Sequence, residues 1–435
     1  MTTAQVRLWG TLIGAVHWDT QQALGRFEYH PRFINSGIEV SPVMMPLSSQ
    51  VYSFPLSKGS SFHGLPGLLA DSLPDRFGHQ LIDLWVTQQG LNVADFDPVA
   101  RLCYVGQKGM GALEYEPSAT TDADHAQPLD LSALVEFANQ VLSERGQLKA
   151  SLAVQERSRA MEQILKVGTS AGGARAKAII AWNPETQEVR SGQVISDPAF
   201  SHWLIKFDGI TDNRNNGELN QPQGFGLLEY AYHLMALACG IQMQECRILT
   251  EGTRNHFMTR RFDRTDTGAK LHMQSLCALG HFDFNQAASY SYEQAFMLMR
   301  QMGLKMADME QLFRRMAFNI MARNQDDHTK NIAFLMDRSG QWRLSPAFDL
   351  TYSYNPEGLW TRQHQMALNG KRDKFELSDF LACSELISMR KGQAQQILEQ
   401  VQKTVRNWPQ FAEQAGVSSE TTARITPAHR TQILA

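Results

Sequence analysis

The sequence lacks the features that mark secreted, membrane-spanning and zinc-binding proteins. Its five cysteines are scattered and none stands in a CxxC pair, which disfavours a disulfide framework or a zinc site and predicts reduced, mostly buried thiols. No run of about 18 apolar residues exists, so no transmembrane helix is expected. The first residues, MTTAQVRLWG, have neither the basic nor the apolar region of a signal peptide. Together these absences predict a cytoplasmic protein with no membrane partner.

The sequence also lacks a strong excess of charge of either sign. The formal net charge is -3 and charged residues make up 20% of the chain, so no global basic field favours direct, non-specific binding of nucleic acid. Internal repeats and low-complexity segments are absent as well. With 435 residues, the chain is too long for one small core, and two or three domains or lobes are expected.

The apolar pattern changes along the chain from strand-like to helical. Strands are expected over residues 4–56, a helix over 74–89, a linker over 116–129, a helix from 131 to 142, and strands near 178–182 and 202–207. Further on, the pattern predicts a helix ending at Gly240, a strand at 255–265, two helices between 293 and 323 separated by Gly303, a strand–turn–strand unit over 331–350, and a helical tail. This order predicts an α+β protein whose β-rich part precedes a helical part.

A polar cluster interrupts apolar sequence in MARNQDDHTKNIAFL, residues 321–335. Asp326 and Asn331 have the spacing D-x-x-x-x-N, and a further acid, Asp349, follows the next predicted hairpin. Phosphoryl transfer needs a carboxylate to orient the attacking hydroxyl and oxygen ligands for Mg²⁺, and protein kinases use this layout. Lys330 would help to neutralise the transferred phosphate. The simpler alternative is a solvated loop at a helix end, with Asn331 in a turn.

A glycine-rich stretch, TSAGGARAK at residues 169–177, would hold nucleotide phosphates. Its glycines permit close backbone approach, and successive N–H groups can form an anion-binding nest. The Walker A pattern is absent, which disfavours a P-loop nucleotidase, and an ordinary tight hairpin remains the alternative. Lys206 is a lone charge in the apolar strand WLIKF, so it needs a partner. That partner is either a phosphate or Glu229 on the following helix, unless Lys206 simply faces solvent.

Four motifs in order, FHGLPGLLADSLPDRFG, TSAGGARAK, NQDDHTKN and LSPAFDL, resemble the HipA family of bacterial serine/threonine kinases from type II toxin–antitoxin modules. The resemblance spans nearly the whole chain. It implies a two-lobed protein-kinase-like fold, with a β-rich N-terminal lobe, an extra N-terminal subdomain and a mostly helical C-terminal lobe. The implied boundaries are residues 1–120 for the subdomain, 121–262 for the rest of the N-terminal lobe with its Gly-rich loop, and 263–435 for the helical lobe.

The resemblance also implies roles for individual residues. Asp326 would be the catalytic aspartate, and Asn331 and Asp349 the Mg²⁺ ligands. Contacts to ATP are implied for Gly172, Gly173, Ala174, Arg175, Ala176, Lys177, Lys206, Arg260, Arg261, Phe262, His328, Thr329, Lys330 and Asn331. Arg260 stands where an acidic residue is expected, although backbone contacts to the adenine side would survive that difference. Glu229 would form the ion pair with Lys206.

Regulation and partners follow from the same resemblance. Ser170 is the expected autophosphorylation site, where added negative charge would repel ATP phosphates and eject the loop. The implied partners are a helix-turn-helix antitoxin of the HipB type, operator DNA bound through the antitoxin complex, and a protein of the translation machinery as substrate, typically an aminoacyl-tRNA synthetase. Asp326 is assigned as the base rather than Asp327 only because it lies five residues before Asn331, the expected spacing, whereas Asp327 lies four residues before it.

Two other classes of function stay open. The chain could be a kinase-like scaffold that acts through an antitoxin or operator DNA without catalysis, although the intact set of Asp326, Asn331, Asp349 and Lys206 argues against this. A small-molecule phosphotransferase would share the D-x-x-x-x-N layout. The first 120 residues and the lack of an H-G-D signature count against that class.

Overall fold

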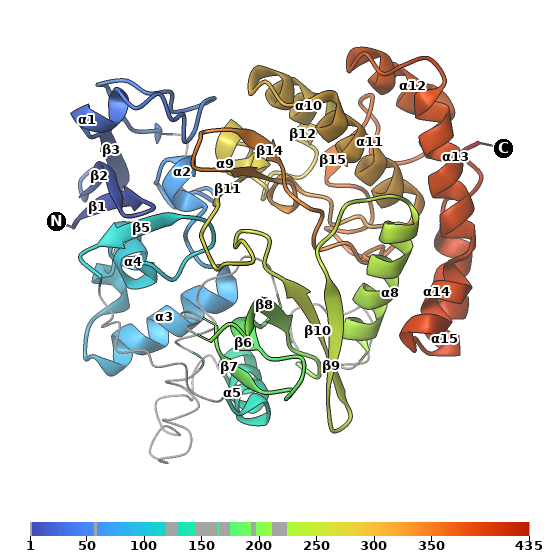
Figure 1. Ribbon diagram of the computed structural model, residues 1–435, viewed down its shortest axis with the longest axis horizontal. Coiled ribbons are helices and arrows are strands. Elements are labelled where there is room, and N and C mark those ends of the chain that lie inside the picture. The colour runs from blue at the N-terminus through green and yellow to red at the C-terminus, as the bar shows by residue number, and fades with distance from the viewer. Residues whose placement is uncertain are drawn as a thin grey trace. The chain divides into compact units, whose positions relative to one another are not determined.

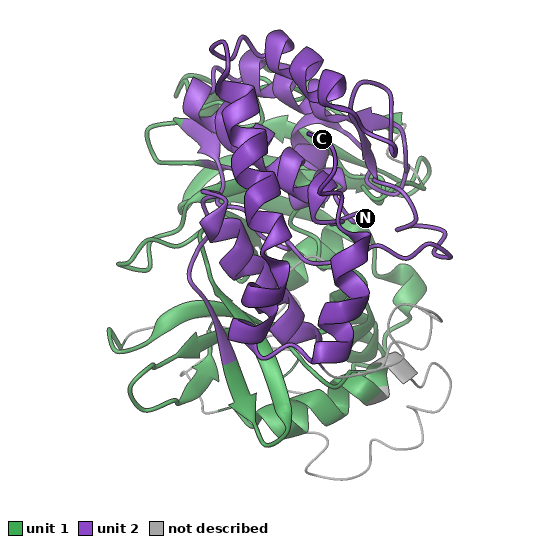
Figure 2. Ribbon diagram, turned by 90° about the vertical axis from the view of Figure 1, so that its right-hand side faces the viewer, with its two compact units in different colours: residues 1–215, 249–274, 336–341 green, residues 216–248, 275–335, 342–435 purple. Residues whose placement is uncertain are grey.

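The structure, a computed structural model, describes residues 2–55, 59–118, 129–143, 164, 175–192, 197–210 and 224–434. The chain divides into two compact units, drawn in green and purple in Figure 2. Unit 1 comprises residues 1–215, 249–274 and 336–341, and unit 2 comprises residues 216–248, 275–335 and 342–435.

The first sheet of unit 1 is antiparallel, with the strand order β4-β3-β2-β1-β5. Its strands are β1 (Thr3–Leu8), β2 (Thr11–Asp19), β3 (Leu24–Tyr29), β4 (Val51–Tyr52) and β5 (Leu113–Glu116). Burial alternates along β1, as expected for a strand with one face on the core. The predicted hairpin is confirmed: β1 and β2 join at Trp9–Gly10, where both residues have positive φ.

Helical segments lie between β3 and β5 along the chain: α1 (Pro31–Ile34), α2 (Gly67–Ala70), α3 (Arg76–Gln88), the 3₁₀ turn η2 (Val93–Asp95) and α4 (Pro98–Val105). Figure 1 shows α4 beside β1 and β5, against which it packs. The helix expected over 74–89 is confirmed as α3. It begins after Asp75, whose carboxylate accepts a hydrogen bond from the Gly78 amide at 2.8 Å.

The second sheet has the order β7-β6-β8-β10-β9. Its strands are β6 (Lys177–Trp182), β7 (Val189–Ser191), β8 (Ser201–Lys206), β9 (Cys246–Glu251) and β10 (Arg254–Arg260). Helix α5 (Leu131–Ser143) covers it, and Leu134, Ile180 and Met258 are fully buried in the shared core. The apolar stripe predicted from residue 131 is therefore a core-facing helix.

Unit 2 is mostly helical. Its larger helices are α8 (Phe225–Ala238), α10 (Tyr292–Gln301), α11 (Met306–Met321), α12 (Leu377–Leu386), α13 (Gln393–Arg406), α14 (Trp408–Ala415) and α15 (Ser419–Ile425). Helix α13 packs against α11 and α8, and α14 packs against α8 (Figure 1). The two helices predicted between 293 and 323 are confirmed, and Gly303 between them has a φ of 73°.

Short elements complete the description: α9 (Leu276–Gly280), η3 (Thr329–Asn331), η4 (Thr426–Ala428), and the strands β11 (His272–Ser275), β12 (Tyr290–Ser291), β13 (Ala333–Met336), β14 (Trp342–Leu344) and β15 (Met366–Ala367). Strands β13 and β14 are neighbours in one sheet, as the strand–turn–strand pattern predicted. The pair β12 and β15 is parallel. All five cysteines are buried and free, as expected.

The division into units differs from the boundaries implied by the resemblance. Residues 263–274 and 336–341, which fall in the implied helical lobe, belong to unit 1, whereas helix α8, which falls within residues 121–262, belongs to unit 2 because it packs on α13 and α14. The chain thus passes from one unit to the other more than once. Most of the expected linker, residues 119–128, lies outside the described residues. Within the part of the chain that the structure describes, no helix is long and apolar enough to cross a membrane.

Candidate active site

The polar loop of unit 2 begins where helix α11 ends. Arg323 has a φ of 59°, in the left-handed region that commonly terminates helices. The Asn324 amide N–H then donates to the Asn319 carbonyl at 2.9 Å, and the two side chains are joined by a 3.0 Å hydrogen bond. The start of the loop is therefore attached to the last turn of the helix by side chains as well as by backbone.

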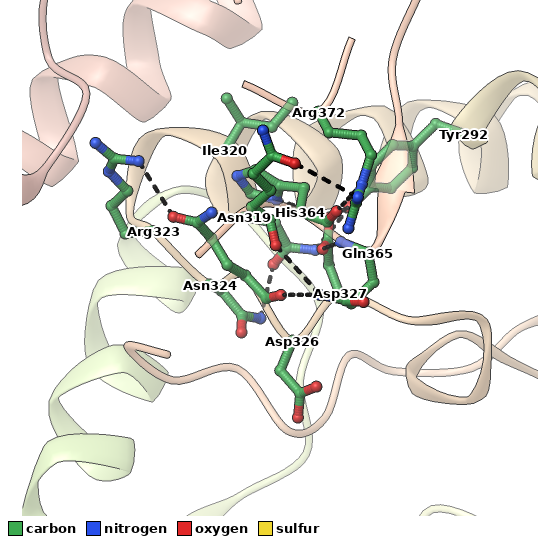
Figure 3. A network of polar contacts seen from close by, with 12 residues as sticks. Tyr292, Asn319, Ile320, Arg323, Asn324, Asp326, Asp327, His364, Gln365 and Arg372 are labelled. Atoms are coloured by element: carbon green, nitrogen blue, oxygen red, sulfur yellow. Dashed lines mark hydrogen bonds and ion pairs between the residues drawn. The ribbon is translucent and has the colours of Figure 1, made fainter. Parts of the chain in front are cut away.

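Asp327 points into the protein and is the centre of the polar network in Figure 3. Its carboxylate accepts hydrogen bonds from the Tyr292 hydroxyl at 2.7 Å, His364 Nδ1 at 2.9 Å and the Gln365 amide at 2.8 Å. Burial alone would raise the pKa of Asp327, but His364 and these donors outweigh burial and hold the pKa below its usual value. Asp327 is thus a buried anion that joins the loop to α10 and to residues 364–365.

Asp326 points away from that network (Figure 3). The backbone N–H of Asp326 donates a hydrogen bond to the Ser353 hydroxyl at 3.0 Å. The carboxylate Oδ1 accepts the Trp360 indole N–H at 2.7 Å, and 41% of the side chain remains exposed. The indole fixes the orientation of the carboxylate, while its other oxygen can accept a further proton donor.

The pKa of Asp326 is raised above its usual value, mainly by desolvation. The nearby carboxylates of Asp349 and Asp327 act in the same direction, because like charges disfavour ionisation. His328 and the Trp360 hydrogen bond oppose the rise. A carboxylate with a raised pKa is a stronger base, which suits a group that orients and accepts a hydroxyl proton.

Asn331 and Asp349 are the expected Mg²⁺ ligands, and they offer the amide and carboxylate oxygens that this ion prefers. Asn331 Nδ2 donates to the Asp326 carbonyl at 2.9 Å, so its amide oxygen is directed away from that hydrogen bond. Asp349 has a φ of 57°, a strained conformation for a residue other than glycine and one that clusters at functional sites. The described residues contain no group of three or more His, Cys, Asp or Glu that could hold a metal. Mg²⁺ requires few protein ligands because it keeps several waters.

The other residues of the loop have different surroundings. The Thr329 hydroxyl is buried and donates to the Phe282 carbonyl at 2.7 Å, so its side chain holds the loop in place. The ring of His328 lies 5.2 Å from that of Phe284, and the Lys330 ammonium lies 5.5 Å from the same ring. The expected phosphate contacts of His328 and Lys330 therefore remain a prediction, and for Thr329 only its backbone is suited to such a contact.

The expected nucleotide residues of unit 1 are described only in part. Ser170, Gly172, Gly173 and Ala174 lie outside the described residues. Arg175 is exposed and Ala176 is buried. Lys177 begins β6 and is 2% exposed, with its ammonium 3.4 Å from the Asp75 carboxylate. Its side chain is thus committed to a buried ion pair with the residue that caps α3.

Lys206 ends β8, and its ammonium lies 5.8 Å from the centre of the Phe257 ring. Glu229 is buried on α8. Because Lys206 belongs to unit 1 and Glu229 to unit 2, their pairing stays a prediction.

The segment expected on the adenine side holds a buried charge cluster. The Arg261 guanidinium donates to both carboxylate oxygens of Asp263, at 2.8 and 2.6 Å, and Arg264 adds a third contact at 2.8 Å. Arg260 instead pairs with Asp266 near the surface, at 2.8 Å, and Phe262 is buried. Arg261 therefore has a structural task, and a nucleotide contact from this segment would use its backbone.

Sequence reasoning missed the residues that hold the loop: Tyr292, Ser353, Trp360, His364, Gln365 and Arg430. The first five stand 27 or more residues from their partners Asp326 and Asp327, and Arg430 contacts the loop's partner His364. No short motif contains them, so no local pattern could have identified them. His364 would mark the site once its contact with Asp327 is known, because a buried histidine beside an acid often belongs to a functional site. The spacing of the two residues along the chain does not reveal that contact.

These features define a class of protein: an α+β protein of two-lobed, kinase-like fold, with an acidic loop between a helix and a hairpin. Residues 169–408 match the model of the HipA-like C-terminal domain, and residues 4–116 match that of the HipA N-terminal domain. The chain belongs to the HipA family. No curated protein sequence matches it.

Solved structures that are similar to this chain include the following two. A chain of the Shewanella oneidensis MR-1 toxin–antitoxin complex of HipA, HipB and operator DNA matches with a TM-score of 0.67 and 17% identity, over 99% of this chain and 96% of its own. At that identity the match shows the fold. The Helicobacter pylori proinflammatory kinase CtkA matches 54% of this chain and 88% of its own at 13% identity, with a TM-score of 0.34, a likeness too weak to characterise the chain.

Proposed function

We propose that this chain is an ATP- and Mg²⁺-dependent serine/threonine protein kinase and the toxin of a type II toxin–antitoxin module. The observation that carries the proposal is the contrast between Asp326 and Asp327. One carboxylate is partly exposed, oriented by an indole and has a raised pKa, while its neighbour is a buried anchor. A solvated loop at a helix end would not require a buried anchor beneath one accessible base.

The proposed chemistry assigns a task to each group. Asp326 orients the attacking serine or threonine hydroxyl and accepts its proton. Asn331 and Asp349 supply oxygen ligands to Mg²⁺, which, when bound with ATP, neutralises charge on the transferred phosphoryl group. Lys206 and the Gly-rich stretch with Gly172 and Gly173 hold the nucleotide phosphates. This division of tasks is that of phosphoryl-transfer enzymes, in which positioning and charge stabilisation supply most of the catalysis.

The proposed biological role follows the family. The similar Shewanella structure holds HipB and operator DNA, which supports a HipB-like antitoxin as partner and operator DNA contact through their complex. The proposed substrate is a protein of the translation machinery, typically an aminoacyl-tRNA synthetase, in the cytoplasm. Autophosphorylation of Ser170 would switch the enzyme off by placing about two negative charges beside the ATP phosphates.

One assay tests the proposal. The purified protein is incubated with labelled ATP, Mg²⁺ and cell lysate, beside Asp326→Asn and the matched control Asp95→Asn. Asp95 is an exposed acid in unit 1. We expect labelled protein bands with the wild type and with Asp95→Asn, and a loss of about 10²–10⁴-fold in rate with Asp326→Asn, the usual contribution of a general base.

Three other outcomes contradict the proposal. Absence of both label and ATP binding indicates a kinase-like scaffold. Label confined to small molecules indicates a small-molecule phosphotransferase. Equal labelling by the wild type and Asp326→Asn would place the base elsewhere.

A further inference from the structure

The end of the chain closes on the C-terminal end of helix α11. The last carbonyls of an α-helix have no partner within the helix and must be satisfied from outside. Here the Arg430 amide donates to the Met321 carbonyl at 2.8 Å, and the Arg430 guanidinium reaches the Ile320 carbonyl at 3.4 Å. Arg323, two residues after the end of α11, donates from Nε to the Ala428 carbonyl at 2.7 Å. Residues 428–430, here called the C-terminal strap, thus bind the junction between helix and polar loop.

The Arg430 side chain also reaches the anchor of the loop. Its guanidinium donates to His364 Nε2 at 2.8 Å, and His364 Nδ1 lies 2.9 Å from the Asp327 carboxylate. Since a guanidinium only donates, Nε2 must accept, and the ring proton must therefore be on Nδ1, directed at Asp327. The guanidinium is held in turn by an ion pair with Asp373, and only 11% of the Arg430 side chain is exposed.

A second contact ties the strap to the same junction. The Tyr232 hydroxyl donates to the Ala322 carbonyl at 2.6 Å and lies 2.9 Å from His429 Nε2. Because the hydroxyl has only one proton, His429 donates to the hydroxyl oxygen. The His429 ring is buried against Tyr232 and Trp408. The carbonyls of residues 320, 321 and 322 are therefore all bound by the strap or by its partner tyrosine.

We propose that the C-terminal strap positions the catalytic loop, and that Arg430 is a positioning residue that orients His364 and, through it, Asp327. As far as activity is concerned, this inference rests on the proposed kinase function. Asp327 is bonded directly to Asp326 along the chain, so a change in its orientation moves the base. A displacement of about 1 Å at a reacting group costs on the order of 10²-fold in rate. The effect on kcat should exceed the effect on KM, because Asp326, next to Asp327, is the proposed base, whereas Lys206 and the Gly-rich stretch, which hold the nucleotide phosphates in the proposed mechanism, belong to unit 1.

The test compares Arg430→Met, Arg430→Lys and the control Arg424→Met, an exposed arginine of α15. We expect Arg430→Met to lower kcat by about tenfold or more, with the KM for ATP within about threefold of the wild type. Arg430→Lys retains the positive charge and an ammonium donor group, so it should recover part of the rate, and Arg424→Met should match the wild type. Hydrogen exchange of the backbone amides in residues 320–331 should be fastest in Arg430→Met, slower in Arg430→Lys, and equal to the wild type in Arg424→Met.

Hydrogen exchange separates this inference from the proposed function, since it does not require catalysis. If the wild type transfers no phosphate, the proposed function fails, and the exchange pattern still decides the role of the strap. Exchange in residues 320–331 that is equal in Arg430→Met and the wild type would overturn the inference. A rise in KM at unchanged kcat would overturn it too. Should Arg430→Met fail to fold, Arg430→Lys is judged by the same two measurements.

Discussion

Adjacent aspartates with opposite surroundings provide the sharpest prediction. Asp326→Asn should lower the rate of phosphoryl transfer by about 10²–10⁴-fold and leave the fold nearly as stable as the wild type. Asp327→Asn should chiefly destabilise unit 2, because its carboxylate is buried and accepts three hydrogen bonds. The two substitutions are chemically identical, so any difference between them comes from the structure around each residue.

The magnitudes follow from the contacts. A hydrogen bond to a charged group contributes about 1.5–3 kcal/mol, and breaking a buried charged pair costs about 3–5 kcal/mol. The amide of Asp327→Asn still offers one acceptor oxygen, but its NH₂ group faces the neighbouring hydrogen-bond donors. We therefore expect the free energy of unfolding to fall by about 3 kcal/mol. Asp326 is 41% exposed and accepts one indole N–H, so water can replace the lost charge and the loss should be about 1 kcal/mol or less.

Two measurements check this prediction: urea unfolding, to give the free energy of unfolding of each variant, and the rate of labelled phosphate transfer from ATP. Unfolding is recorded at pH 7, where Asp327 is ionised. Its lowered pKa means that its contribution to stability is present above the usual value of 3.8 and is lost only as the pH falls through the lower folded value.

The reasoning would be refuted by an Asp327→Asn variant as stable as the wild type, since the carboxylate would then not anchor the loop. It would also be refuted if Asp326→Asn unfolded at clearly lower urea than Asp327→Asn. A rate for Asp326→Asn within about threefold of the wild type would contradict the assigned role of the base.

Four further predictions concern pH, charge and regulation. Trp360→Phe removes a hydrogen bond that lowers the pKa of Asp326, so the acid limb of the kcat/KM profile should move to higher pH; an unmoved limb would contradict the contribution of the indole hydrogen bond. Asp263→Asn leaves two buried guanidinium groups without their carboxylate, and urea unfolding should show a loss of about 3–5 kcal/mol. Burial lowers the pKa of His429 from 6.5 to about 3. The stability that the neutral ring contributes is therefore fully present above pH 6.5 and is lost as the pH falls toward 3. Between pH 6.5 and 5, the free energy of unfolding should fall by about 2 kcal/mol more in the wild type than in His429→Phe. Ser170→Ala should raise toxicity and prevent phosphorylation of the Gly-rich stretch, and phosphopeptide mapping that places the label elsewhere would contradict the assigned site.

The sequence by itself determined the order and type of the main elements. Apolar residues with a helical repeat, together with glycines at helix ends, predicted α3, α5, α8, α10 and α11 within a few residues. Both signals are local, because an amphipathic face and a terminating residue in the left-handed conformation depend only on nearby sequence. The D-x-x-x-x-N spacing with Asp349 drew attention to the polar loop for the same reason, since the spacing of residues within one loop is a local property of the sequence. The family, too, was recognisable from four short motifs.

Only the tertiary structure decided how the two aspartates differ. Asp326 and Asp327 share a sequence context, and their surroundings come from Tyr292, Trp360 and His364, which lie 34 to 37 residues away along the chain. Burial and hydrogen bonding depend on which distant segments fold against the loop, and no local pattern encodes them. The same holds for Lys177 and Arg261, whose charges are bound in buried ion pairs. It holds most clearly for Arg430, which lies in the predicted helical tail of the sequence and contacts His364 and the end of helix α11 in the structure.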